Sequence, residues 1–171
     1  ATKVQHWRRL GINRVSLGVQ SFDPDLLKLL GREHSPDDVA ESVRLLREAG
    51  IPQVNIDLMF SLPGQSLQQW EHTLRSAIDL QPDHISTYNL SYEEDTDFFR
   101  HYGAEAGDEE SDVAMFTMAD EMLTAAGYRH YEISNYARSG CESLHNLACW
   151  HGEDYCGLGP GAVGTMNGTR Y

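Results

Sequence analysis

The sequence has 171 residues, a formal net charge of −13 at pH 7 and a hydrophobic fraction of 40%. This length supports one domain with a proper core, and the acidic balance argues against nucleic-acid binding because an acidic surface repels phosphates. No apolar run approaches the roughly 18 residues of a membrane span, and residues 1–10 lack a signal-peptide pattern, so we expect a cytoplasmic location.

Strands and helices are expected to alternate along most of the chain. Residues 1–10 are typical of a helix that Gly11 ends, and a chain that begins inside a helix is expected to be an internal fragment. Asp23-Pro24 and Ser35-Pro36 are both helix starts, with an N-cap followed by proline at the first helical position. The further expected elements are strand 14–19, helix 24–30, helix 36–49, strand 54–60, helix 67–80, strand 84–90, helix 112–126 and strand 128–134.

This alternation predicts an α/β fold with a parallel sheet, outer helices and right-handed crossovers. Strand 54–60 is almost continuously apolar, which is typical of a strand covered on both faces. Residues 91–110 are expected to form a long, solvated acidic connection, and no long periodic segment follows Asn135. Four strands cannot close an eight-stranded barrel, so we expect an open sheet or part of a barrel.

Polar residues at the carboxyl ends of the expected strands are the candidates for a site, because parallel α/β folds bind ligands there. Asp57 interrupts an apolar strand and needs a partner, and an arginine such as Arg32 is a plausible one. The position of Gln20 favours a role in the site and a role in a turn about equally. On sequence alone, Arg32 is expected to be an ordinary surface residue. The other candidates at this edge are His34, Ser86, Tyr88, Asn89, Glu132, Ser134 and Asn135.

Three further features carry weaker signals. The three cysteines are an odd number and lack CxxC spacing, so idle or buried thiols are favoured over a disulfide scaffold or metal ligation. Gly157–Gly161 resembles a nucleotide-binding loop, but it follows no first βαβ strand, and a structural turn is the better reading. His145 and His151 do not have a zinc-site spacing, and no Ser–His–Asp or paired-carboxylate arrangement can be placed.

Ordered motifs along the chain resemble the oxygen-independent coproporphyrinogen III oxidase-like family of the radical SAM superfamily. They are Gly11–Phe22 (GINRVSLGVQSF), Leu30–His34 (LGREH), Asn55–Met59 (NIDLM) with Leu62–Gln65 (LPGQ), and Pro82–Ser86 (PDHIS). The motifs Tyr131–Ala137 (YEISNYA) and His145–Trp150 (HNLACW) resemble the HemW-type haem-chaperone branch, whose usual HNxxYW pattern has tyrosine where this chain has Cys149.

The resemblance implies a partial (β/α)6 TIM barrel that binds S-adenosylmethionine and a 4Fe-4S cluster. Residues 1–135 would form the C-terminal half of the barrel, and residues 136–171 would begin the HemN-type C-terminal region. The resemblance places Gln20, Arg32 and Asp57 in contact with S-adenosylmethionine, with weaker assignments for Ser91 and Ala162. His145 is the candidate haem ligand, beside an equally weighted structural role.

The family's cluster-binding CxxxCxxC loop and glycine-rich S-adenosylmethionine motif are not in this sequence. The cluster ligands are therefore expected outside it, and no catalytic or metal-ligating residue is assigned within it. The function that the resemblance favours is a haem chaperone that binds haem and delivers it to client proteins, with peripheral membrane contact through clients. The alternative is an oxygen-independent coproporphyrinogen III dehydrogenase, which leaves open whether the protein is an enzyme.

Overall fold

Five strands form one mixed sheet in the order β1-β2-β3-β5-β4 in a computed structural model that describes residues 2–103 and 109–171. β1 pairs with β2 and β2 with β3 in parallel, whereas β5 pairs antiparallel with both β3 and β4. The strands are β1 (Arg14–Gln20), β2 (Gln53–Phe60), β3 (His84–Asn89), β4 (Arg129–Glu132) and β5 (Asn135–Ala137). The expected α/β class is confirmed, with a sheet that is parallel only in its first part.

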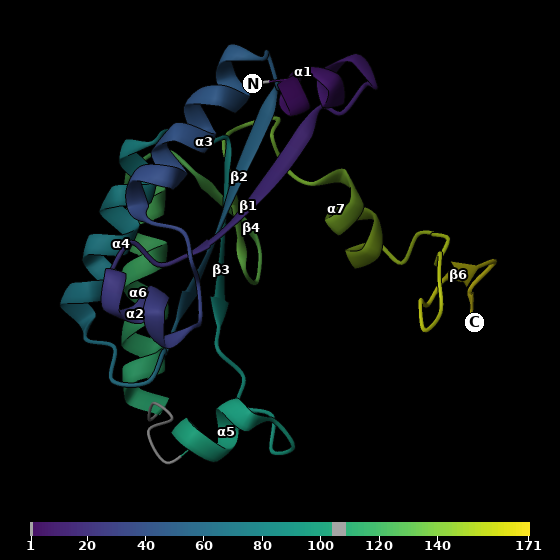
Figure 1. The fold of residues 1–171 in the computed structure, drawn as a ribbon. Helices are drawn as coiled ribbons and strands as arrows, with labels where there is room; N and C mark the ends of the chain where they lie inside the picture. The colour runs from purple at the N-terminus through teal and green to yellow at the C-terminus, as the bar shows by residue number, and fades with distance from the viewer. Residues whose placement is uncertain (1, 104–108) are drawn as a thin grey trace.

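Helices cover one side of this sheet, and Figure 1 shows α2, α3, α4 and α6 together on that side. Helix α7 lies on the opposite side, followed by a small hairpin that extends away from the sheet (Figure 1). The helices are α1 (Thr2–Arg9), α2 (Pro24–Leu29), α3 (Pro36–Glu48), α4 (Leu67–Asp79), α5 (Asp97–Tyr102), α6 (Glu109–Ala125) and α7 (Leu144–Trp150). The hairpin consists of β6 (Thr165–Met166) and β7 (Thr169–Arg170).

Side-chain caps explain where several of these helices begin. The Asp23 carboxylate accepts hydrogen bonds from the backbone of the first turn of α2, and Ser35 forms a capping box with Asp38 at the start of α3. Both starts were expected from the sequence and are confirmed. A second capping box, between Ser66 and Gln69, starts α4. These caps satisfy amide groups that a helix leaves without partners at its N-terminus.

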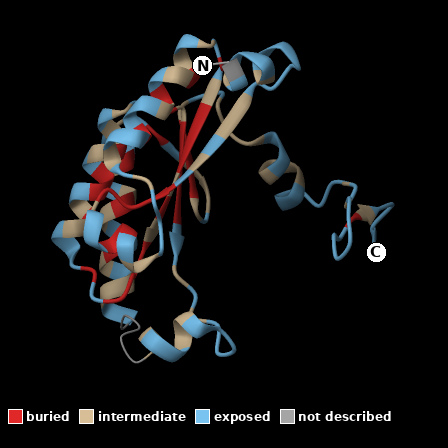
Figure 2. Cartoon of the chain, in the orientation of Figure 1, coloured by how far each residue is buried: buried red, intermediate tan, exposed pale blue. Residues whose placement is uncertain are grey.

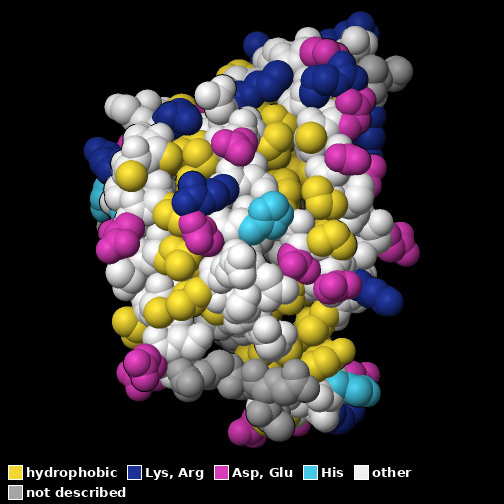
Figure 3. Space-filling view, turned by 90° about the vertical axis from the view of Figure 1, so that its left-hand side faces the viewer, with side chains coloured by type: hydrophobic (Ala, Val, Ile, Leu, Met, Phe, Trp, Pro, Cys, Tyr) yellow, Lys and Arg dark blue, Asp and Glu magenta, His cyan; other side chains and the backbone are white. Residues whose placement is uncertain are grey.

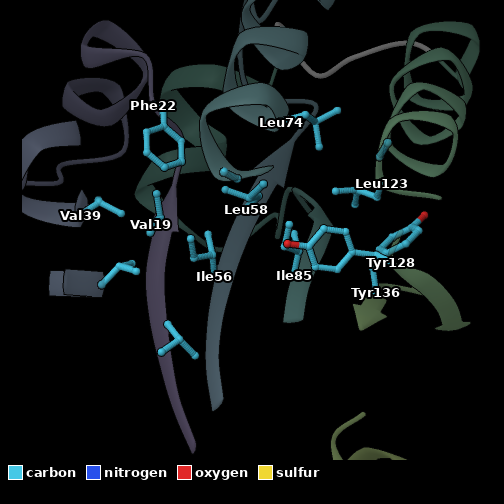
Figure 4. Packing of buried hydrophobic residues seen from close by; sticks show 14 of the residues in the cluster. Val19, Phe22, Val39, Ile56, Leu58, Leu74, Ile85, Leu123, Tyr128 and Tyr136 are labelled. Atoms are coloured by element: carbon cyan, nitrogen blue, oxygen red, sulfur yellow. The ribbon is translucent and has the colours of Figure 1, made fainter. Parts of the chain in front are cut away.

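The hydrophobic core lies between the sheet and the covering helices, as the close view in Figure 4 and the buried residues in Figure 2 show. Alternate residues of β2 point into it, because successive side chains of a strand point to opposite faces. Val54, Ile56 and Leu58 are completely buried on that face, and Trp70 of α4 donates its indole N–H to the Met115 carbonyl of α6 at 2.9 Å. The core thus joins β2, α4 and α6.

Two expectations about these elements need correction. β2 is covered by helices on one face only, and its opposite face carries Asn55 and Asp57. The single strand expected at 128–134 ends at Glu132, whose carboxylate accepts a hydrogen bond from the Ser134 amide and closes a tight turn into the antiparallel strand β5. That strand includes residues on both sides of the domain boundary expected between residues 135 and 136.

The acidic connection expected at 91–110 contains helix α5, which Thr96 caps by accepting a hydrogen bond from the Phe99 amide. Residues 104–108 of this connection lie outside the described residues, while the acidic run Glu93–Asp95 is exposed as expected. Acidic and basic side chains are interspersed over the helix-covered side in Figure 3. No helix in the described part of the chain is both long and apolar enough to span a bilayer.

Candidate functional site

The face of the sheet opposite the covering helices carries a concentration of polar side chains. In-register pairing places Ser16, Asn55 and His84 in one row across β1, β2 and β3. The next row contains Gly18, Asp57, Ser86 and Asn135. Residues that are directly paired in a sheet point to the same face, so the two rows form a continuous polar surface.

A polar cavity of about 210 Å³ lies on this surface. Its lining residues come from four strands, from α7 and from the segment before α7: Arg14, Ser16, Asn55, Asp57, His84, Ser86, Tyr88, Asn135, Ser143 and Asn146. The cavity therefore brings together segments that are far apart in the sequence. Its lining is rich in amide and hydroxyl groups and includes one carboxylate. Such a lining suits a polar ligand better than an apolar one.

Asn55 is the centre of the hydrogen bonds on this surface. Its Nδ2 donates to Asp57 Oδ1 at 2.7 Å and to Ser16 Oγ at 3.1 Å. Its Oδ1 lies 2.7 Å from His84 Nδ1 and accepts a hydrogen bond from Ser86 Oγ at 3.3 Å. Because the Asp57 carboxylate accepts from the amide nitrogen, the carbonyl oxygen of Asn55 must face His84.

This orientation determines the tautomer of His84. Its Nδ1 must carry the proton that Asn55 Oδ1 accepts, so Nε2 accepts from the Tyr131 hydroxyl, 2.8 Å away. The Tyr131 oxygen in turn accepts a hydrogen bond from the Ser143 amide at 3.2 Å. Burial, with a smaller contribution from the nearby charge of Arg14, lowers the pKa of His84 to about 3, so the imidazole is neutral at physiological pH.

The result is a chain of hydrogen bonds, Ser143–Tyr131–His84–Asn55–Asp57, that we call the Asp57 relay. Every donor in the relay points toward Asp57. A carboxylate that accepts such a bond is held in one orientation. The relay also connects the segment before α7 to the middle of β2, so it links the two sides of the cavity.

Gln20 reaches the same row through an irregularity at the end of β1. The pairing shifts between Gly18 and Gln20, and Gln20 has a positive φ of 69°. A Cβ atom added to Gly18 would lie 3.0 Å from Gln20 Nε2, so the Gln20 amide lies close over this glycine. Because Gly18 pairs with Asp57, the amide and the carboxylate are on neighbouring strands at the same level of the sheet.

Asn135 and Glu132 form the other end of this row. The Glu132 carboxylate accepts a hydrogen bond from Asn135 Nδ2 on one oxygen and from Trp150 Nε1, at 3.1 Å, on the other. Trp150 is the last residue of α7, and this bond attaches the helix to the β4–β5 turn. The two motifs at 131–137 and 145–150 therefore meet in the structure.

Arg32 does not pair with Asp57, which corrects the partner suggested by the sequence. Arg32 is exposed in the loop after α2, whereas Asp57 is bonded to Asn55, its neighbour two positions away on the same strand face. His34 lies beside the end of β1, where its Nε2 is 3.1 Å from the Val19 carbonyl oxygen. Asn89 also lies away from the cavity, since it donates a hydrogen bond to Asp112 at 3.0 Å.

The remaining candidates are exposed. Ser91 lies in the segment after β3, and Ala162 lies in a turn in which its amide bonds to the Gly159 carbonyl. His145 is exposed on α7, with its Nε2 3.8 Å from Cys149 Sγ. Within the described ranges, the three cysteines are free, and no group of three or more His, Cys, Asp and Glu side chains is arranged to hold a metal ion.

Asn55, His84 and Tyr131 were not among the residues assigned to the site from the sequence. A usable signal was present in β2, where the polar residues 55 and 57 alternate with the apolar residues 54, 56 and 58. The same two-residue spacing continues in β3 at 84, 86 and 88. Alternation of this kind predicts a strand with one polar face, which is where the cavity lies.

Known proteins match this chain over almost its whole length. A family model described as the radical SAM superfamily matches residues 2–77. A Bacillus subtilis protein named heme chaperone HemW is 40% identical over 99% of this chain and 46% of its own length. The Escherichia coli protein of the same name is 41% identical over 97% of this chain and 44% of its own length.

The chain thus spans about half the length of the curated relatives it matches. Among solved structures, coproporphyrinogen III oxidase (HemN) from Escherichia coli, described as a radical SAM enzyme, superimposes with a TM-score of 0.79. The match covers 95% of this chain and 41% of that protein at 24% sequence identity. At this identity, the likeness establishes the fold, which matches the partial barrel expected from the sequence.

Proposed function

The chain belongs to the radical SAM superfamily, and we propose that its polar sheet face forms part of an S-adenosylmethionine site in a protein that binds haem and delivers it to client proteins. The observation that carries the ligand assignment is the Asp57 carboxylate, held by Asn55 at the edge of a polar cavity with the Gln20 amide beside it. The relatives named heme chaperone support the haem assignment.

The residues present fit S-adenosylmethionine by their chemistry. Asp57 offers carboxylate oxygens to ribose hydroxyls or to the ammonium group, and the Gln20 amide can donate and accept. Arg32, with an exposed guanidinium, would clamp the ligand's carboxylate from the loop after α2. We retain Ser91 and Ala162 as weaker contacts of the same proposal.

When bound, S-adenosylmethionine and a 4Fe-4S cluster supply the one-electron chemistry that gives the superfamily its name. The residues of this chain bind and orient the ligand: Asn55 fixes the Asp57 carboxylate, and Gly18 leaves room for the Gln20 amide. We propose that the cluster's ligands lie outside this sequence, because the family's CxxxCxxC loop is not in it.

For haem, we propose His145 as the ligand because of its position in the HNLACW motif, and its side chain is exposed on α7. We also propose that residues 1–135 belong to the barrel and residues 136–171 to the C-terminal region. The proposed partners are haem-accepting client proteins, and the proposed location is the cytoplasm. The Trp150–Glu132 bond ties α7 to the sheet, so a ligand bound on the helix would lie near the cavity.

Anaerobic reconstitution of the full-length protein, including the cluster-binding segment expected outside this sequence, tests this function. We expect stable haem binding, seen as a Soret band that persists through gel filtration, and no decarboxylation of coproporphyrinogen III. A His145→Ala variant should show an altered haem spectrum, with His151→Ala, also exposed, as the matched control. Turnover of coproporphyrinogen III would instead support the alternative function, an oxygen-independent coproporphyrinogen III dehydrogenase. The likeness to HemN supports that alternative through the fold alone.

A further inference from the structure

Asn135 has a buried acceptor atom that the described protein does not satisfy. The residue is only 5% exposed, and its Oδ1 makes no hydrogen bond within the described residues. Buried carbonyl oxygens are rarely left in this state, because losing water without gaining a donor is unfavourable. Asn135 also lines the polar cavity, so the buried, unsatisfied oxygen belongs to a side chain of the cavity wall.

The orientation of the Asn135 amide is determined by its neighbour Glu132. One Glu132 oxygen accepts from Asn135 Nδ2 and from the Ser134 amide, while the other accepts from Trp150 Nε1. A carboxylate only accepts hydrogen bonds, so the amide must turn its nitrogen toward Glu132. The carbonyl oxygen is therefore left on the other side.

Asn135 also has a defined position relative to Asp57. Both belong to one row of paired residues, with Ser86 of β3 between them. Neighbouring strands are about 4.8 Å apart, so Asp57 and Asn135 are separated by roughly 10 Å across two strand spacings. A small molecule lying along the row can bond to both acceptors.

We propose that Asn135 Oδ1 is an acceptor subsite for an N–H or O–H donor of a small molecule held in the cavity, an inference that rests on the proposed function. Two sources carry this chemistry. One is S-adenosylmethionine, through its ammonium or hydroxyl groups. The other is a free-base tetrapyrrole, whose pyrrole N–H groups are absent from haem because iron replaces those hydrogens.

The test compares Asn135→Leu with Thr87→Val in the full-length protein that includes the expected cluster-binding segment. Thr87 is a matched control: it is 2% exposed, its Oγ1 also lacks a partner in the described residues, and it lies on the helix-covered face of β3. Affinities for S-adenosylmethionine, free-base coproporphyrin III and haem are measured by anaerobic calorimetry. Thermal unfolding monitors the fold, and Asn135→Ser replaces Asn135→Leu if the latter does not fold.

We expect Asn135→Leu to weaken S-adenosylmethionine or free-base coproporphyrin about three- to tenfold, as for one lost hydrogen bond, with Thr87→Val unchanged. The ligand whose affinity falls is the one that supplies the donor. The affinity for haem should stay unchanged even if that for free-base coproporphyrin falls, because haem has no pyrrole N–H groups. Unchanged affinity for both ligands overturns the subsite, and a wild-type chain that binds neither overturns both the subsite and the proposed function.

An Asp57→Asn arm separates the two claims. If Asp57→Asn loses S-adenosylmethionine affinity and Asn135→Leu changes no affinity, the subsite fails and the proposed ligand site stands. If Asn135→Leu weakens binding and Asp57→Asn does not, the assignment of Asp57 fails while the subsite stands.

Discussion

Asn55 Nδ2 donates a 2.7 Å hydrogen bond to Asp57 Oδ1, and the two residues lie two positions apart on the polar face of β2. This bond answers how a strand in the middle of the sheet accommodates a carboxylate. Asn55 does not act alone, because His84 and Ser86 contact its carbonyl oxygen and prevent the amide from rotating. The position of Asp57 therefore depends on β3 as well as on its own strand.

Substitution of Asn55 by leucine should damage both stability and binding. The change removes the donor to Asp57 and leaves the His84 Nδ1–H without its acceptor. An unsatisfied buried donor costs about 1–3 kcal/mol, so we expect a loss of unfolding free energy in that range. Denaturant unfolding and S-adenosylmethionine titration measure the two effects.

Ser16→Ala provides the control for that substitution. Ser16 accepts a longer hydrogen bond from the same Asn55 nitrogen and is exposed, so its loss should change stability by less than about 0.5 kcal/mol. Equal effects of Asn55→Leu and Ser16→Ala would show that the Asp57 relay does not hold the carboxylate.

His84 should make stability depend on pH. Burial lowers its pKa from 6.5 to about 3, so the unfolded chain binds this proton more readily than the folded protein does between those values. The free energy of unfolding should decrease as pH falls from about 6.5 toward 3, by up to about 1.4 kcal/mol per pH unit from this group. Above pH 6.5 the contribution is constant.

His84→Asn should remove that dependence while the exposed His6→Asn, on α1, should not. Urea denaturation at several pH values between 4 and 7 gives the slope for each protein. A wild-type slope that His84→Asn leaves intact would mean that other groups carry the pH dependence.

Gly18→Ala tests the position of the Gln20 amide. The new Cβ would lie 3.0 Å from Gln20 Nε2, so the flexible end of the glutamine must move, at little cost in stability. We expect S-adenosylmethionine affinity to fall several-fold, by about the worth of one hydrogen bond.

Gly50→Ala is the opposite case. Gly50 has a φ of 76° at the end of α3 with nothing near its would-be Cβ, so alanine there should cost about 1 kcal/mol of stability without changing affinity. A loss of S-adenosylmethionine affinity in Gly50→Ala would argue against a role for the Gln20 amide. An unchanged affinity in Gly18→Ala would argue against it as well.

Trp150→Phe tests how α7 is attached. The substitution keeps the ring but removes the donor to Glu132, and Trp150 is 57% exposed, so we expect a stability loss of about 1 kcal/mol or less. Hydrogen exchange should accelerate in α7 while the β1–β3 amides keep their protection. Unchanged exchange in α7 would show that other contacts hold the helix.

Local signals in the sequence predicted much of this architecture. Proline and capping residues located the starts of α2 and α3, since both act within a few positions of the chain. The return strand β5 was missed because it has only three residues and is specified by pairing with β3, which is about 50 residues away in the sequence. Short strands of this kind depend on tertiary contacts.

Only part of the site was predicted, because the rest of it also depends on tertiary contacts. Gln20 could be selected from its position at a strand end and Asp57 as an acid inside an apolar strand, both with support from motif resemblance, and Asn135 was among the polar candidates. The relay through His84 and Tyr131 could not be selected, because it depends on the register of β2 with β3 and on the segment before α7. Arg32 illustrates the converse, since a suitable charge did not ensure contact with Asp57.

The central claim is that the carboxylate of Asp57 binds S-adenosylmethionine, and Asp57→Asn tests it most directly. The substitution preserves shape and an acceptor for Asn55, so the fold should be retained. Asp79→Asn, at an exposed carboxylate of α4, is the matched control. In an anaerobic titration of the full-length protein, we predict that Asp57→Asn weakens S-adenosylmethionine binding about ten- to a hundredfold and Asp79→Asn leaves it unchanged. Wild-type affinity in a folded Asp57→Asn protein would contradict the account.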